Sequence, residues 1–496
     1  MKIKTILGKT PMAKVYGATG DLDIANLRCK LGEDLEGALF FCLHDEKGQG
    51  IIEAIQAKQK GAFAIVSEKQ LELDIPQIIV PNVRKAMATM ASAFYDNAVQ
   101  DLKVVGITGT NGKTTTTYII KNILEKAGHS VGLIGTNCNM IKNEVLATSL
   151  TTPDPIELHE LFYKMREAGC DYVVMEVSAH ALYFDKLEGV QFEVGIFTNL
   201  SRDHLDFFEN FDNYASAKFK LFNPLFTKCA IINSDDEYGR QFAKDTKIER
   251  LLTYGTDNPA DCFAVDLKLN MQGSSFFINL CDQVEEMRFT IPGRYNVMNS
   301  LAAAACTYAL CVSMEHIKAG LGDMKGVDGR YNVYHSPHGF DVVVDYAHTP
   351  DGLENILKSV RDITRGRIIN VFGCGGNRDK TKRPIMGEIS GAIANYTIIT
   401  SDNPRMEDPN TIISEIEKGI SNITHNYCKL ENRKLAIEYA LSIAQKGDTI
   451  LVLGKGAENY QDIQGTKYHF CDAEVVNECL AKEKDFEVAD DLELHG

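Results

Sequence analysis

Short apolar runs alternate with amphipathic stretches along most of the 496-residue chain. Before residue 100, the runs ALFFCL, AFAIVS and QIIV predict short strands, and the pattern around 50–60 predicts a helix. Further along, the runs YVVMEV, VGIFTNL and CAIINS alternate with helical patterns. Near the end, FDVVVDYA, RIINVFGCG, YTIITSD and TILVLGKG each lead into a loop and then a helical stretch. Repeated strand-then-helix alternation is typical of parallel sheets covered by helices.

We therefore predict an α/β protein of three domains, in line with the chain length. The segment 1–99 is the N-terminal domain, 100–332 is a central domain with a parallel sheet, and 333–496 is a C-terminal Rossmann-like α/β domain. In the last segment, the loops DYAHTP, GCGGNRDKTKRP, SDNPR and GKGAENYQ follow the predicted strands. Open α/β sheets bind ligands at the carboxyl ends of their strands, so these loops are candidate binding loops.

Composition narrows the class of protein. Hydrophobic residues make up 44% of the chain and charged residues 24%, which is ordinary for a globular protein. The net charge of −16 disfavours a general nucleic-acid binder. Thirteen cysteines without a CxxC pair are typical of a reducing cytoplasm. No apolar run approaches the ~18 residues of a membrane span, so we expect a cytoplasmic protein without membrane insertion.

The stretch VVGITGTNGKTTTTYII, residues 104–120, combines an apolar strand, a glycine-rich turn and the start of a helix. Glycines allow a tight turn with exposed backbone N–H groups, and a helix N-terminus favours an anion. Lys113 can reach nucleotide phosphates, and the Thr114 hydroxyl can hold Mg²⁺. Ile107 stands where the general P-loop pattern has its first glycine, which leaves a solvated glycine-rich turn as the alternative. Strand, Gly-Lys-Thr and helix together favour a P-loop ATPase domain.

Two residues after predicted strands are candidate ligands of a metal beside this loop. Glu176 ends the apolar run YVVMEV, where a carboxylate can hold Mg²⁺ next to bound phosphates. A surface glutamate after a strand is an equal alternative in isolation. His204 follows VGIFTNL, where a single histidine is more often structural than a ligand.

Lys218 lies on an apolar stripe of helical spacing formed with Tyr214, Leu221, Phe222 and Leu225. A long lysine side chain usually extends to water from such a position. The alternative is a buried lysine whose lowered pKa lets it react with CO₂. The resulting carbamate is an anion that could bind a metal.

In these residues and in a series of motifs the chain resembles the Mur ligase family, most closely its MurE type. The motifs cover roughly residues 100–480 and are TGTNGKTTT, LTTPDP, MEVSAHAL, NLSRDHLD, YASAKFKLF, INSDDE, GRYNVMNSLAA, GVDGR, DYAHTPDGL, GCGGNRDKTKRP, SDNPR and GKGAENYQ. The resemblance implies a cytoplasmic, monomeric ligase with ATP and Mg²⁺ as cofactors. It would add meso-2,6-diaminopimelate to UDP-N-acetylmuramoyl-L-Ala-D-Glu through an acyl phosphate, in peptidoglycan precursor synthesis.

The resemblance also implies roles for individual residues. Nucleotide binding would fall to Gly109, Thr110, Asn111, Gly112, Lys113, Thr114, Thr115, Asn296, Asn299, Arg330 and Asp345. Catalysis would involve Lys113, Glu176, His204 and Lys218, with magnesium held by Thr114, Glu176, His204 and the Lys218 carbamate. The UDP-muramoyl peptide would contact Thr151, Thr152, Ser178 and Lys186. Diaminopimelate would contact Arg378, Asp402, Asn403, Pro404, Arg405, Gly454 and Glu458.

The DNPR stretch indicates the amino acid, because a planar guanidinium pairs in a bidentate manner with a carboxylate such as the distal one of diaminopimelate. We expect Arg405 at the end of a strand, and Glu458 as the group that receives the distal ammonium. An exposed surface arginine is the alternative for Arg405.

Several positions depart from the family pattern. Asn26-Leu27-Arg28 replaces Asp-Ser-Arg, so uracil would be held in the first domain by groups other than a serine hydroxyl. Lys186 replaces an arginine, and Phe208 and Ala457 replace histidines. A lysine-adding MurE, a Mur ligase paralogue with another substrate, a P-loop switch or motor ATPase and a non-catalytic relative remain alternatives.

Overall fold

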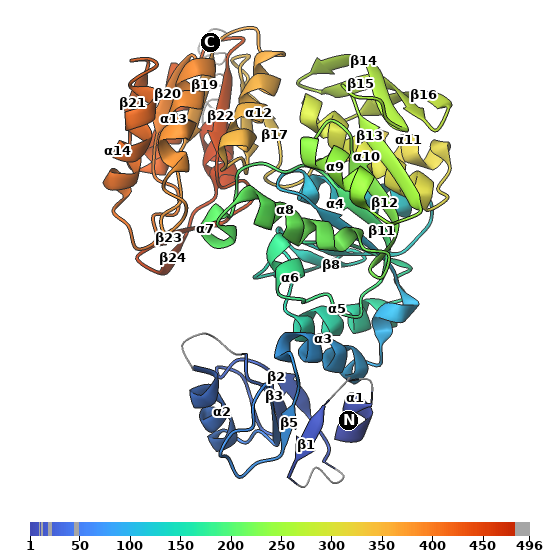
Figure 1. Cartoon of the computed structure of the whole chain (residues 1–496). Helices are drawn as coiled ribbons and strands as arrows, with labels where there is room; N and C mark the ends of the chain where they lie inside the picture. The colour runs from blue at the N-terminus through green and yellow to red at the C-terminus, as the bar shows by residue number, and fades with distance from the viewer. Residues whose placement is uncertain (9, 11–12, 18–21, 44–48, 482–496) are drawn as a thin grey trace, which may run out of the picture.

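The computed structural model describes residues 1–8, 10, 13–17, 22–43 and 49–481, and its strands form three large sheets (Figure 1). These sheets have five, eleven and six strands, and a two-stranded hairpin accompanies them in the described part of the chain. The N-terminal sheet lies at one end of the molecule, where its helix α3 (Val83–Phe94) packs against α5 (Pro155–Glu167) of the central segment. The C-terminal sheet lies beside the central one. The domain boundaries at residues 99 and 332 stay a prediction.

The N-terminal sheet has the strand order β1-β5-β4-β3-β2, parallel except for β1. Its strands are β1 (Lys14–Tyr16), β2 (Asn26–Arg28), β3 (Ala38–Phe41), β4 (Ala64–Ser67) and β5 (Gln77–Ile79). The three predicted strands are confirmed, and the predicted helix is α2 (Gln49–Gln59). Helix α1 (Ile3–Leu7) and α3 pack on one face of the sheet through Ile3, Ile6 and Met87.

The central sheet is parallel in its middle, in the order β7-β10-β6-β11-β12-β13-β14. These strands are β6 (Lys103–Thr108), β7 (Val131–Ile134), β10 (Tyr172–Glu176), β11 (Phe192–Phe197), β12 (Thr227–Asn233), β13 (Arg250–Gly255) and β14 (Cys262–Asn270). Helices of this segment are α4 (Lys113–Lys126), α5, α6 (Ala179–Tyr183), α7 (Leu205–Phe208), α8 (Phe211–Phe219), α9 (Glu237–Asp245), α10 (Arg294–Ala309) and α11 (Met314–Gly322). Helices α4 and α10 pack together against β6, β11 and β12, so the phosphate-loop helix is part of the main core.

The expectation of a parallel sheet is wrong at both edges. Strands β8 (Asn139–Ile141) and β9 (Glu144–Leu146) extend one edge antiparallel, and β15 (Gly273–Leu280) and β16 (Gln283–Phe289) extend the other. Between β15 and β16, Cys281 and Asp282 have φ of 49° and 68°. Two positive φ values are the geometry of a tight hairpin turn, and glycine or asparagine usually marks such a turn in a sequence. Here neither residue gives that signal.

The C-terminal sheet has the order β17-β18-β22-β19-β20-β21, parallel except for the edge strand β17. Its strands are β17 (Asn332–His335), β18 (Asp341–Asp345), β19 (Ile368–Phe372), β20 (Tyr396–Ile399), β21 (Tyr427–Lys429) and β22 (Thr449–Leu453). Its helices include α12 (Pro350–Arg361), α13 (Lys382–Ile393), α14 (Pro409–Ile420) and α15 (Arg433–Ile443). After β22 the expected helix is preceded by a hairpin, β23 (Tyr460–Ile463) and β24 (Thr466–His469), which turns at Gln464 and Gly465 with positive φ.

Candidate functional site

A cavity of about 1060 Å³ lies between the loops of the central and C-terminal sheets. On one side its lining comes from the segments after β6, β7 and β11 and from the last residues of β10 and β12. On the other side it comes from the segments after β18, β19, β20 and β22. The carboxyl ends of both parallel sheets therefore face one space, which is where open α/β sheets bind ligands.

The phosphate loop is the turn between β6 and α4. Gly109 and Gly112 have φ of 148° and 85°, and a Cβ at Gly109 would lie 1.8 Å from Thr198 Oγ1. A Cβ at Gly112 would lie 2.4 Å from Asn299 Oδ1. Only glycine fits at both positions, so the loop keeps its backbone N–H groups clustered at the N-terminus of α4.

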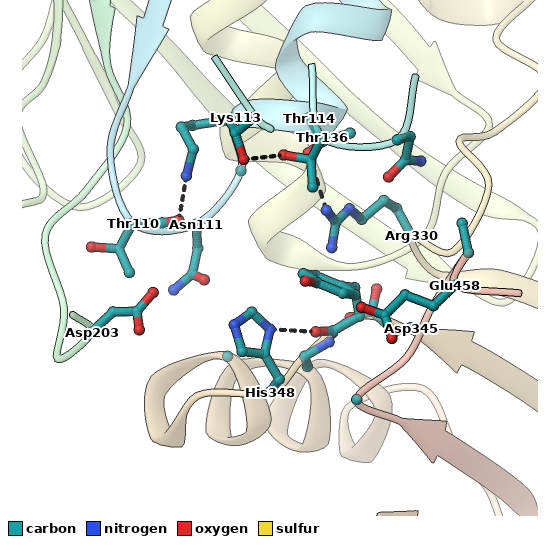
Figure 2. Close-up of a pocket in the computed structure, with 18 of the residues that line it drawn as sticks. Thr110, Asn111, Lys113, Thr114, Thr136, Asp203, Arg330, Asp345, His348 and Glu458 are labelled. Atoms are coloured by element: carbon teal, nitrogen blue, oxygen red, sulfur yellow. Dashed lines mark hydrogen bonds between the residues drawn. The ribbon is translucent and has the colours of Figure 1, made fainter. Parts of the chain in front are cut away.

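Lys113, the first residue of α4, folds back over this loop. Its Nζ donates to the carbonyl oxygens of Gly109 and Thr110 at 3.0 and 2.8 Å, as Figure 2 shows for Thr110. Burial lowers the pKa of the ammonium, and Glu176 opposes that shift. The lysine therefore stands where the phosphates of a nucleotide would reach the loop.

Glu176 ends β10 as predicted, and its buried carboxylate is 1% exposed. Thr114 Oγ1 donates to it at 2.9 Å, and the backbone N–H and hydroxyl of Thr136 donate at 2.8 and 3.0 Å. A carboxylate and a threonine hydroxyl beside a phosphate loop are the oxygen donors that Mg²⁺ prefers. The described residues contain no group of three or more His, Cys, Asp or Glu suited to a metal, so a metal would also need donors from nucleotide, water or a modified side chain.

Lys218, on α8, is 1% exposed, which excludes the expectation that its side chain extends to water. Its Nζ donates to the Gly109 carbonyl at 2.7 Å and lies 4.5 Å from the centre of the Tyr214 ring. Burial, with a further contribution from Lys113, holds the pKa of Lys218 well below its usual range. The predicted stripe ends early, because α8 stops at Phe219 and Leu225 is exposed beyond it.

His204 and Asp203 lie in the loop after β11, beside the same wall. His204 has a left-handed backbone, and its Nε2 lies 3.3 Å from Asp203 Oδ2. Sequence reasoning missed Asp203, which lines the cavity opposite His348 (Figure 2). Burial would raise the pKa of the Asp203 carboxyl, but His204, His348 and Lys382 outweigh it and hold that pKa below its usual range. Its position directly before His204 was the only signal in the sequence.

The predicted nucleotide contacts on α10 and at the hinge line the cavity together with Thr110, Asn111 and Thr115. Asn299 Nδ2 donates to Asn296 Oδ1 at 3.0 Å, which fixes the two amides relative to each other. Arg330 Nη2 donates to Thr114 Oγ1 at 3.1 Å, so the hinge arginine reaches the phosphate loop. Asp345 accepts from two backbone N–H groups, and burial raises its pKa.

The predicted peptide-binding residues divide into two groups. Thr151 lines the cavity and accepts from Thr136 Oγ1 at 3.0 Å. Thr152, Ser178 and Lys186 do not line it. Thr152 donates to the Glu176 carbonyl, Ser178 caps α6, and Lys186 Nζ lies 2.7 Å from Asp154 Oδ1. Their role in substrate binding stays a prediction.

At the far end of the cavity, Arg405 lies in the loop after β20, not at the end of the strand, which ends at Ile399. Its Nη1 donates to the Gly376 carbonyl at 2.8 Å, and its side chain is half-buried. Glu458 Oε2 accepts from Asn403 at 2.8 Å and from the buried Lys455 at 3.1 Å. Sequence reasoning missed Lys455. Its ammonium neutralises the carboxylate of Glu458, the residue predicted to receive the distal ammonium of diaminopimelate. Arg378, Asp402 and Gly454 also line this end, and Pro404 is buried behind it.

Comparison with known proteins identifies the family. The Mur ligase middle domain matches residues 107–307, and the Mur ligase glutamate ligase domain matches residues 329–456. The UDP-N-acetylmuramoyl-L-alanyl-D-glutamate–2,6-diaminopimelate ligase 1 of Clostridium acetobutylicum is 45% identical over 485 residues, covering 97% of this chain and 99% of that protein. The chain belongs to the Mur ligase family. The predicted resemblance is confirmed, and it extends into the N-terminal segment.

Other relatives agree. The ligase of the same type from Bacillus licheniformis is 39% identical over 493 residues, covering 98% of this chain and all of that protein. A solved structure of a UDP-N-acetylmuramoyl-L-alanyl-D-glutamate–2,6-diaminopimelate ligase is 29% identical with a TM-score of 0.71, and the match covers 98% of this chain and 100% of that one. MurF of Thermotoga maritima in complex with ADP shares the fold, with 18% identity and a TM-score of 0.63, over 94% of this chain and 100% of that one.

In this Mur ligase, helix α12 and the start of α13 contact the phosphate loop and the loop after β11. Asn111 Nδ2 donates to Asp351 Oδ2 at 2.7 Å, and Arg202 Nη2 donates to Thr381 Oγ1 at 2.8 Å. Together with the bond from Arg330 to Thr114, these contacts hold the two walls of the cavity together. Among the described helices, none has the length and apolar character needed to cross a membrane.

Proposed function

We propose that this chain ligates meso-2,6-diaminopimelate to UDP-N-acetylmuramoyl-L-Ala-D-Glu at the expense of ATP, in peptidoglycan precursor synthesis. One observation carries the proposal: the phosphate loop and the DNPR loop line the same cavity, in a chain 45% identical over nearly its full length to a ligase of that name. A P-loop switch would have no need of the loops of the C-terminal sheet that line the other side of the cavity.

The chemistry follows from the charges in the cavity. A carboxylate is a poor electrophile, so the γ-phosphate of ATP is transferred to it, and the resulting acyl phosphate carries a good leaving group. The incoming amine attacks the acyl carbon, the carbon–oxygen bond to phosphate breaks, and the amine loses a proton. No nucleophile from the enzyme is needed. The approach of two anions in the first step requires cations, and Lys113 and Arg330 supply them at the phosphate loop.

The donors around the phosphate loop fit magnesium. Thr114 would hold one ion, and Glu176 and His204 with carbamylated Lys218 would hold a second. The metal would neutralise phosphate charge. Lys218 lies directly behind Gly109, so an anion formed on its Nζ would lie next to the phosphates.

We place UDP in the N-terminal sheet, near the edge strand β2 that carries Asn26-Leu27-Arg28. Arg28 donates to the Leu27 and Asp34 carbonyls and lies 3.1 Å from Glu33, so its side chain supports the local turn. We further infer that the enzyme works as a monomer in the cytoplasm. All thirteen cysteines are free thiols, which fits a reducing compartment.

The test is ADP release with each substrate omitted in turn. We expect ADP only when ATP, UDP-N-acetylmuramoyl-L-Ala-D-Glu and meso-diaminopimelate are all present, and loss of release on chelation of magnesium. ADP release from ATP alone at the full rate would instead favour a switch or motor ATPase. Release with another carboxylate in place of the muramoyl dipeptide would favour a paralogue.

A further inference from the structure

The β23–β24 hairpin is fastened to the DNPR loop. Backbone and side-chain hydrogen bonds of 2.7 to 2.9 Å join the two segments. Both the backbone N–H and the backbone carbonyl of Arg405 take part in them. The pairs are Arg405 N to Asp462 O, Gln464 N to Arg405 O, Asp462 N to Asn403 Oδ1 and Gln461 Nε2 to Asp402 O. The hairpin is therefore a built part of the amino-acid end of the cavity.

This hairpin presents a second cation to the cavity. Lys467 and Tyr460 both line it, and Lys467 Nζ lies 4.1 Å from the centre of the Tyr460 ring. Register explains the contact: Lys467 pairs with Asp462, so it lies diagonally across from Tyr460 on the same face. The Tyr460 phenol is also within electrostatic range of the Arg405 guanidinium. The aromatic ring holds the ammonium by a cation–π contact.

Some of the other polar groups at this end are already bonded within the protein. Glu458 is paired with Lys455, and Arg405 Nη1 is bonded to the Gly376 carbonyl, which leaves the rest of its guanidinium for a ligand. In the described part of the chain, Lys467 forms no ion pair, even with its cross-strand neighbour Asp462. Lys467 and Arg405 thus remain for an anion, together with Arg378, which also lines this end, and a carboxylate has acceptor sites for more than one cation.

We propose that Lys467 is a specificity-determining residue that binds the distal carboxylate of the incoming diamino dicarboxylate together with Arg405. The proposal rests on the proposed function. Lysine lacks this carboxylate, so its binding would leave two like charges near each other without an anion. Lys467 therefore increases discrimination against lysine beyond what Arg405 alone gives.

The test is steady-state kinetics of Lys467→Met with meso-diaminopimelate and with L-lysine. We expect the KM for diaminopimelate to rise about fivefold, a value in keeping with a partly exposed charge pair. The kcat and the KM for ATP should hardly change, and the KM for L-lysine should stay the same or fall. Lys467→Arg should restore most of the affinity. Lys418→Met, at an exposed position of α14 outside the cavity, is the matched control.

Two results would overturn the proposal. An unchanged ratio of kcat/KM values for the two amino acids in Lys467→Met would show that Lys467 does not recognise the distal group. An equal rise in KM for both amino acids would place Lys467 on the α-carboxylate instead. If the unmodified enzyme ligates neither amino acid, the proposed function itself fails, and that outcome is seen before any variant is made.

Discussion

The side chain of Lys218 is buried in the folded chain, and its single hydrogen-bond acceptor in the described structure is the Gly109 carbonyl. A buried lysine is more stable neutral, and a neutral amine can react with CO₂ to form a carbamate. The sequence pattern alone was compatible with two states of Lys218: a side chain that extends to water, and a buried amine that can form a carbamate. The structure decides for burial because Tyr214, Leu221 and Phe222 pack around α8.

We predict that Lys218→Ala lowers the rate of ligation by on the order of a hundredfold or more, since loss even of a residue that only supports a metal ligand typically costs about 10–100-fold. Added acetate or formate should restore part of the rate, because a small carboxylate can fill the space left by the carbamate. Phosphate release is the readout. Lys220→Ala, at a largely exposed lysine two residues away, should keep the full rate. Full activity of Lys218→Ala would show that no anion is needed there.

Arg405 gives a second prediction at this scale. Arg405→Lys keeps the positive charge but loses the planar pair of N–H donors that matches a carboxylate. We expect the KM for diaminopimelate to rise about tenfold or more, since a charged hydrogen bond is worth roughly 1.5–3 kcal/mol. The KM for ATP should stay within about twofold, because Lys113 and Thr114 lie at the other end of the cavity. A parallel rise in both KM values would mean that the substitution disturbs the whole cavity.

At the scale of helices and strands, the sequence pattern predicted most of the elements that carry the site. Strands β10, β11 and β12 and helix α4 could be predicted, because continuous apolar runs and the Gly-Lys-Thr turn are strong local signals. The edge strands β8, β9, β15 and β16 were missed because their alternation is weak, and the turn between β15 and β16 contains neither glycine nor asparagine. The β23–β24 hairpin was missed for a related reason: β24 is exposed and β23 only half-buried, so the two short strands carry little hydrophobic pattern.

Site residues follow the same division. Glu176 and Lys113 are predictable, since Glu176 ends an apolar strand and Lys113 follows the glycine-rich turn after another. Asp203 and Lys455 were missed, because their importance depends on partners far away in the chain: His348 for Asp203 and Asn403 for Lys455. Lys467 was missed because its contact with Tyr460 depends on the register of the β23–β24 hairpin. The C-terminal sheet brings these partners together, and spacing along the sequence does not show that.

Helix α5 carries a buried histidine that makes stability depend on pH. His159 is 1% exposed, its Nε2 has no hydrogen-bond partner, and burial lowers its pKa to about 4. Between that value and the unfolded value near 6.5, the unfolded chain binds more protons. Stability from this residue is therefore fully present above about pH 6.5 and is lost as the pH falls toward about 4, by about 3 kcal/mol at most.

We predict that His159→Leu reduces the loss of stability between pH 7 and pH 5, measured as the change in free energy of unfolding in urea. His425→Gln, at an exposed histidine, should leave the pH dependence as it is in the unmodified protein. An identical pH dependence in His159→Leu would mean that this histidine is not buried as a neutral group.

For the whole molecule, the decisive feature is that two parallel sheets present the carboxyl ends of their strands to one cavity. The central sheet brings the phosphate loop and Glu176, and the C-terminal sheet brings the DNPR loop and the hairpin. Bonds from Arg330 to Thr114 and from Asn111 to Asp351 hold these walls together. Exclusion of water matters for a ligase, because an acyl phosphate exposed to water would be hydrolysed.

The most direct test of this account is a competition in one reaction. The enzyme receives ATP, magnesium, UDP-N-acetylmuramoyl-L-Ala-D-Glu and equal concentrations of meso-diaminopimelate and L-lysine, and the UDP-linked products are separated and weighed by mass spectrometry. We predict that the diaminopimelate product exceeds the lysine product by about a hundredfold. Binding of lysine would lose the distal charge pair, and that loss costs on the order of 3 kcal/mol, which corresponds to this discrimination. Equal amounts of the two products, or the lysine product alone, would contradict the assignment of the DNPR loop and its neighbouring hairpin to the distal carboxylate.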